Sequence, residues 1–123
     1  GPFASDSKRN NDKIRKAFLP TLEKYGADLV LSGHDHSYAR GSKAGVTYLT
    51  SVSGPKYYGS GAADWKRGGA VREVAAYRTS TYQSILVTST ELKVNAVVGH
   101  QAKGAWPQSR VGRVLDTFTL QAD

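Results

Sequence analysis

The stretch of sequence that decides the fold is residues 25–40, which read YGADLVLSGHDHSYAR. Within it, Asp28–Ser32 has three consecutive apolar residues between polar ends, a pattern typical of a short strand buried on both faces. Apolar character stops at Gly33, where the backbone can turn sharply because glycine lacks a side chain. The sequence therefore predicts a buried strand that ends directly in a turn carrying histidines.

That turn holds two of the three histidines of the chain, His34 and His36, on either side of Asp35. Open α/β sheets place their ligand sites at the carboxyl ends of strands, and neutral imidazole is a common ligand of Zn, Fe and Mn. Asp35 could orient a ligating histidine. A His-x-His sequence also occurs in ordinary polar loops, so the spacing alone leaves a metal site and a hydrogen-bonded loop both open.

A helix is predicted before this strand and mostly strands after it. The helix has apolar residues at helical spacing, with a kink or restart expected at Pro20. Its predicted apolar stripe consists of Ile14, Ala17, Phe18, Leu22 and Tyr25. The later strands are expected at Val46–Val52, Tyr82–Thr88, Leu92–Val98 and Val114–Leu120, with loops at 53–70 and 99–112.

The strands at Tyr82–Thr88 and Leu92–Val98 follow each other so closely that an antiparallel hairpin is the natural pairing. In the last strand, Val114, Phe118 and Leu120 are expected on one face. With one main helix for several strands, the sequence predicts an α/β fold in a single domain over residues 1–123, without an internal boundary. His100 follows a strand and is expected in an exposed loop.

The amino-acid composition limits which ligands and partners the chain can have. The 123 residues include no cysteine, which excludes disulfides and thiolate metal ligands. No apolar run approaches the roughly 20 residues of a membrane span, so no membrane partner is expected. The formal net charge of +7 comes from scattered Lys and Arg, with no nucleic-acid-binding motif beside them. A small basic module that binds anions or nucleic acid is therefore the alternative function class, and specific nucleic-acid binding is not expected.

Residues 25–40 closely resemble the final motif of calcineurin-like metallophosphoesterases, in which purple acid phosphatases carry Gly-His-x-His followed by x-Tyr. The stretch Val46–Gly54 resembles the next strand of that family, and Val114–Leu120 resembles its last strand. The resemblance covers most of the chain, and its most specific part is residues 25–54.

The resemblance implies a four-layer αββα sandwich with two metal ions, drawn from Fe, Zn and Mn, that bind a phosphate ester and activate a water or hydroxide for hydrolysis. His34 would bind one metal and His36 the other. The implied supporting or substrate-rim residues are Gly33, Asp35, Tyr38 and Arg40. For Tyr38 and Arg40, ordinary packing and surface charge remain an equal alternative.

The family also requires an earlier Asp-containing motif, a Gly-Asp motif that supplies a bridging carboxylate, a Gly-Asn-His motif and a further histidine, and the sequence contains none of these. The chain is therefore expected to be the C-terminal half of the sandwich, with no complete catalytic site, at most weak metal binding and no turnover alone. It is also expected to self-associate through its uncovered strands. The compartment is left open; a secreted or periplasmic parent is compatible with the sequence.

Overall fold

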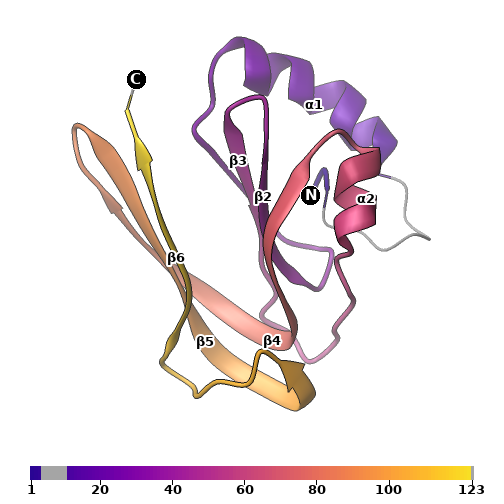
Figure 1. The fold of residues 1–123 in the computed structure, drawn as a ribbon, viewed down its shortest axis with the longest axis vertical. Coiled ribbons are helices and arrows are strands. Elements are labelled where there is room, and N and C mark those ends of the chain that lie inside the picture. Colours follow the sequence, from indigo (N-terminus) through magenta and orange to yellow (C-terminus); the bar gives the residue numbers. More distant parts are fainter. Residues whose placement is uncertain (4–10, 123) are drawn as a thin grey trace.

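A computed structural model describes residues 1–3 and 11–122. The chain is a mixed α/β fold, made mostly of strands with few helices, as the sequence predicted (Figure 1). Neither helix in the described chain has the length and apolar composition needed to cross a membrane. The elements in chain order are α1 (Asp12–Lys24), β1 (Leu29–Ser32), β2 (Tyr38–Lys43), β3 (Val46–Thr50), α2 (Ala62–Arg67), β4 (Val71–Val87), β5 (Glu91–Trp106) and β6 (Val114–Gln121).

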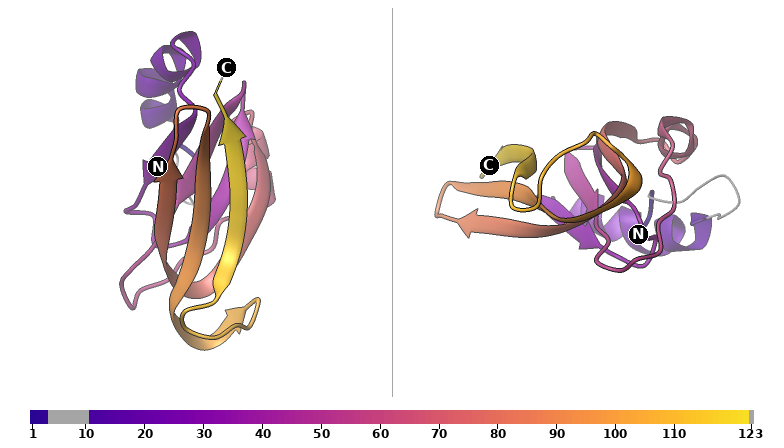
Figure 2. Two further views of the ribbon diagram at one scale, coloured as in Figure 1. Left: turned by 90° about the vertical axis from the view of Figure 1, so that its left-hand side faces the viewer. Right: turned by 90° about the horizontal axis from the view of Figure 1, so that it is seen from below.

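The strands form one six-stranded sheet in the order β1-β3-β2-β4-β5-β6. The pair β1–β3 is parallel and the other pairs are antiparallel. The long strand β4 joins the two halves of the sheet, because its first part pairs with β2 and its second part, from Tyr77 onward, pairs with β5. Its register shifts between Tyr77 and Thr79 and again between Ser80 and Thr81. Such bulges bend a strand, and the sheet curls here (Figure 2).

Two apolar cores lie on opposite faces of the curled sheet. The first packs α1 and α2 against one face of β2 and β3, with Trp65, Tyr48 and Leu19 among its buried members. The second fills the inside of the curl, where Tyr38 and Leu49 pack in one cluster with Val94 and Ala96 of β5. Strands β2 and β4 lie between β3 and β5 in the sheet, and the cluster runs across all four strands.

The predicted helix is confirmed, but not in every detail. It does not restart at Pro20, since α1 runs without interruption from Asp12 to Lys24. Pro20 is exposed, so water can hydrate the carbonyl that proline leaves without a partner. The predicted stripe is not the buried face either. Leu19 is buried, whereas Phe18 is 60% and Tyr25 is 75% exposed.

The predicted hairpin and last strand are confirmed, and several predicted loops are in fact regular structure. The hairpin is β4–β5, with Gln83 opposite Ala96. Strand β5 runs on to Trp106 through the predicted loop at 99–112, so His100 is an exposed strand residue. Helix α2 lies within the predicted loop at 53–70 and buries Trp65. Strand β2 was missed because its sequence, YARGSK, has no apolar alternation.

Candidate metal site

The two histidines occupy a strained turn at the carboxyl end of β1. Their φ angles are 72° at His34 and 51° at His36, in the left-handed region that side chains other than glycine rarely adopt. Each such residue costs roughly 1–2 kcal/mol. His34 is exposed, and its side chain makes no hydrogen bond to any residue that the structure describes.

His36 is fixed by the loop that follows β3. Its Nδ1 lies 3.0 Å from the backbone oxygen of Lys56, and its backbone oxygen accepts a 2.8 Å bond from the N–H of Tyr58. The imidazole also packs against the ring of Tyr58, with 5.4 Å between ring centroids. Because a carbonyl oxygen only accepts, Nδ1 must carry the proton. In the neutral imidazole, Nε2 then keeps its lone pair and is the atom of His36 that can ligate a metal.

Asp35, between the two histidines, is buried at 4% exposure. Its carboxylate forms an ion pair with the amino group of Gly1. This is compatible with the predicted supporting role, which stays a prediction. Gly33, the other predicted supporting residue, connects β1 to this turn and is exposed.

Tyr38 and Arg40 lie in a different polar cluster, centred on Asp116 of β6. The hydroxyl of Tyr38 donates to Asp116 Oδ2 at 2.8 Å. The Nε of Arg40 donates to the same oxygen at 2.7 Å, and its Nη2 donates to Oδ1 at 3.1 Å. The guanidinium also pairs with Glu73 and lies 4.5 Å from the ring centroid of Phe118. The cluster therefore ties β2 to β6 across the inside of the curl, and a substrate-rim role for these two residues remains a prediction.

The electrostatics of this cluster follow from burial and from Asp116. Burial, together with the adjacent Asp116 carboxylate, raises the pKa of Tyr38 far above its usual value. Burial lowers the pKa of Arg40, but its bonds to Asp116 and the negative charges of Asp116 and Glu73 outweigh burial and raise the pKa overall. Tyr38 is therefore neutral and Arg40 charged throughout the physiological range.

The histidine turn does not by itself form a complete metal site. Among residues 1–3 and 11–122, no group of three or more His, Cys, Asp or Glu side chains converges. Catalytic zinc sites normally take three protein ligands, so two histidines provide only part of one. The sequence analysis missed Lys56 and Tyr58, which hold His36, because their place beside the turn depends on how a glycine-rich loop folds back.

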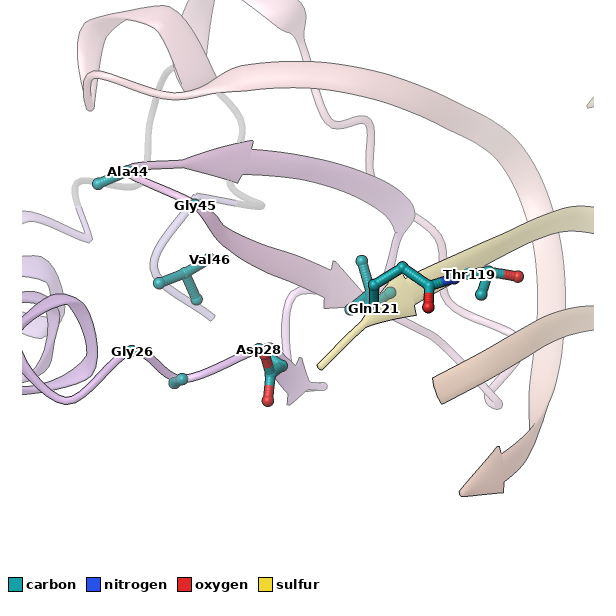
Figure 3. Close-up of a pocket in the computed structure, with 9 residues that line it drawn as sticks. Gly26, Asp28, Ala44, Gly45, Val46, Thr119 and Gln121 are labelled. Carbon is teal, nitrogen blue, oxygen red and sulfur yellow. The ribbon is translucent and has the colours of Figure 1, made fainter. Parts of the chain in front are cut away.

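A pocket of about 270 Å³ lies at the opposite end of β1 (Figure 3). It opens where β1 and β3 begin and β6 ends, and Asp28 and Gln121 face it from the two sides. Asp28 is the one charged side chain among the described residues that line it. The pocket lacks the imidazoles of the histidine turn, so it offers no comparable set of ligands.

Comparison with known proteins does not identify a family for this chain. No protein-family model matches the sequence, and no curated protein matches it either.

Proposed function

We propose that this chain is the C-terminal part of a metal-dependent phosphoesterase, in which His34 and His36 each bind one ion of a dinuclear centre. One observation carries the proposal: both histidines are held in left-handed conformations within one turn, and Nε2 of His36 is left free. Backbone strain of this kind clusters at functional sites, because it persists only where the surrounding structure imposes it.

The donor set fits the metals that the resemblance implies. Imidazole suits Zn, Fe and Mn, and the exposed His34 beside the half-buried His36 leaves room for ligands from elsewhere. A pair of such ions, when bound, would polarise a phosphate ester and activate a water for in-line attack. The contribution of this chain is the backbone oxygen of Lys56, which accepts from Nδ1 of His36 and so orients that imidazole.

We propose further that the curled sheet is part of an αββα sandwich whose remaining layers come from additional chain. Strand β1 lies at one edge of the sheet, with Leu31 52% exposed. On α1, Ile14 and Phe18 are one helical turn apart and both exposed. A further strand against β1 and a further helix against α1 would cover these residues. In the isolated chain the same edge is open to pairing with a second copy, which is the self-association expected from the sequence.

The test is metal binding by the isolated chain, measured by calorimetry with Zn²⁺ and Mn²⁺. Two ligands predict weak, exchangeable binding that His34→Ala and His36→Ala each weaken further. The matched control is His100→Ala, an exposed histidine outside the turn, which should leave binding unchanged. Tight binding that neither turn variant alters would place the metal ligands elsewhere and end the proposal.

Hydrolysis of a phosphate ester provides a second test. The isolated chain should hydrolyse a generic aryl phosphate no faster than buffer with the same metals. A longer chain that includes the upstream coding sequence should show metal-dependent hydrolysis, and His36→Ala should abolish it while His100→Ala does not. A longer chain that binds metal at the turn but hydrolyses no phosphate ester would exclude the phosphoesterase function.

A further inference from the structure

The first part of β4 has a pairing partner on one side only. From Val71 to Ala76 it pairs with β2, and its pairing with β5 begins only at Tyr77. Within the described part of the chain, no backbone hydrogen bond joins residues 71–76 to any segment other than β2. A strand segment of this length spans about 20 Å. The first part of β4 therefore presents an open strand edge.

Strand β5 leaves this edge at Trp106. It forms its last pair there, opposite Tyr77, and the next residue is Pro107, which has no N–H to donate to a neighbouring strand. The chain then turns back, because the backbone oxygen of Pro107 accepts a 2.8 Å bond from Nε2 of Gln101, a residue of β5 itself. The edge of β4 is therefore open beyond the point where proline removes the donor that a longer β5 would need.

A pocket of about 330 Å³ follows the open edge, lined by residues 72–75 of β4 together with Tyr77, Trp106 and Pro107. Within this lining, Val74 packs against one of the two cores and Ala75 against the other, so the pocket reaches both faces of the sheet and lies on the edge itself. Trp106 is 63% exposed, and its ring centroid lies 6.2 Å from that of Tyr77. The pocket therefore offers an aromatic contact at the end of the open edge.

The charges along the edge favour an acidic partner. Glu73 already forms an ion pair with Arg40. Arg72, by contrast, donates to two neutral acceptors, the backbone oxygen of Ser60 and, at 3.3 Å, the hydroxyl of Tyr77, and it forms no ion pair in the described chain. Opposite charges across a pair of strands stabilise the pairing. An added strand that carries a carboxylate would supply the charge that Arg72 lacks.

We infer that the open edge of β4 binds an extended acidic segment of a separate protein, which adds a strand beside residues 71–76. Its backbone supplies the missing ladder bonds, a carboxylate pairs with Arg72, and an apolar side chain enters the pocket beside Trp106. This binding requires no metal at the histidines. Strands β3 and β2 separate this edge from β1, where the additional chain of the proposed function would join, so the two edges take different partners.

The test uses the isolated chain and a capped synthetic peptide of about eight residues. This probe alternates valine and threonine, with a glutamate at its centre and a phenylalanine at one end. On binding, amide hydrogen exchange followed by NMR should slow within residues 71–76 and stay unchanged at residues 29–32 of β1. Glutamine in place of the glutamate of the probe should weaken binding about fivefold. Proline at alternate positions of the probe should abolish binding, because proline cannot donate to a strand edge.

Two substitutions in the chain locate the probe. Trp106→Ala should weaken binding about fivefold. Its matched control is Tyr82→Ala, which removes a ring that is 57% exposed from the second part of β4 and should leave binding unchanged. In Arg72→Gln, the glutamate and glutamine probes should bind equally. If Arg72→Gln fails to fold, a probe with lysine in place of glutamate tests the same charge on the native chain, and it should bind more weakly than the glutamine probe.

The inference fails if the native chain does not bind the glutamate probe. Equal binding of the proline probe would mean that the pocket takes side chains without strand pairing, and equal binding of the glutamate and glutamine probes would remove the preference for an acidic partner. Exchange at residues 71–76 that slows without peptide, as the protein concentration rises, would assign the edge to a second copy of this chain. Each of these results would overturn the inference without bearing on metal binding at the histidines.

Discussion

Tyr38 and His36 are close neighbours in the sequence, yet their polar groups meet opposite surroundings. The Tyr38 hydroxyl is fully buried and bonded to Asp116, in a cluster where Arg40 satisfies both carboxylate oxygens. In the histidine turn, by contrast, two residues hold strained backbone conformations, and the His34 side chain is exposed.

This difference distinguishes residues whose contacts stabilise the fold from residues whose backbone conformation costs stability. The Asp116 cluster links β2 to β6, which are not neighbours in the sheet, and so it stabilises the curl. In the histidine turn, His36 is held by the Lys56 carbonyl and the Tyr58 ring, but no described contact of the exposed His34 side chain offsets the cost of its left-handed conformation. A strained, exposed imidazole of this kind is better explained by a ligand than by folding.

The largest expected effect follows removal of Asp116. Asp116→Ala leaves the buried Arg40 charge and the Tyr38 hydroxyl without their main partner, and should lower the free energy of unfolding by about 3–5 kcal/mol. Urea denaturation would measure it. The control is Asp64→Ala, whose partner Arg67 is 61% exposed, with an expected loss below about 1 kcal/mol. Equal losses for the two variants would show that the buried cluster does not stabilise the curl.

Sequence alone predicted the strand that contains Asp116 but not its partners. The strand Val114–Leu120 was expected to present one apolar face through Val114, Phe118 and Leu120, and Asp116, between Val114 and Phe118, is a visible break in that pattern. A single sequence does not show which residues pair with Asp116. Arg40 lies 76 residues earlier, and the curl that brings the two together depends on bulges in β4.

The histidine turn was predictable for a local reason: a short apolar strand ends in glycine and then in histidines, all within a few residues. Its supports were not predictable. Lys56 and Tyr58 reach His36 from a glycine-rich stretch that reads as a surface loop. In each case tertiary packing overrode the local pattern.

A smaller effect is expected from alkaline pH. The pKa of Tyr38 is raised by burial and by Asp116, so above about pH 10 the unfolded state loses this proton while the folded state keeps it. Stability from this residue is therefore complete below about pH 10 and falls above it, by about 1.4 kcal/mol between about pH 9 and about pH 11. Urea denaturation at the two pH values would measure the loss.

Tyr38→Phe is the control for that measurement. The variant should be less stable at both pH values, because Asp116 loses a donor, but its stability should fall less between them. Part of the fall should remain, since burial also raises the pKa of Tyr48. An identical fall in Tyr38→Phe and the native chain would show that Tyr38 titrates normally, and the cluster would then be less closed than its geometry indicates.

The smallest expected effect has the opposite sign and tests the histidine side of the comparison. His34→Gly relieves the left-handed strain at φ 72° and removes a side chain without a hydrogen bond in the described chain, so it should raise the free energy of unfolding by about 0.5–1 kcal/mol. His34→Ala removes the imidazole but keeps the strain, and should leave stability unchanged. His36→Gly should gain less stability than His34→Gly, because it also loses the Lys56 bond and the Tyr58 ring contact.

Urea denaturation of the three variants measures what each histidine contributes to folding, and Zn²⁺ calorimetry measures what it contributes to metal binding. A more stable His34→Gly that binds Zn²⁺ more weakly is the result expected if this position is kept for a metal. A destabilised His34→Gly would instead make His34 a structural residue like Tyr38, and the contrast between the two polar regions would fail.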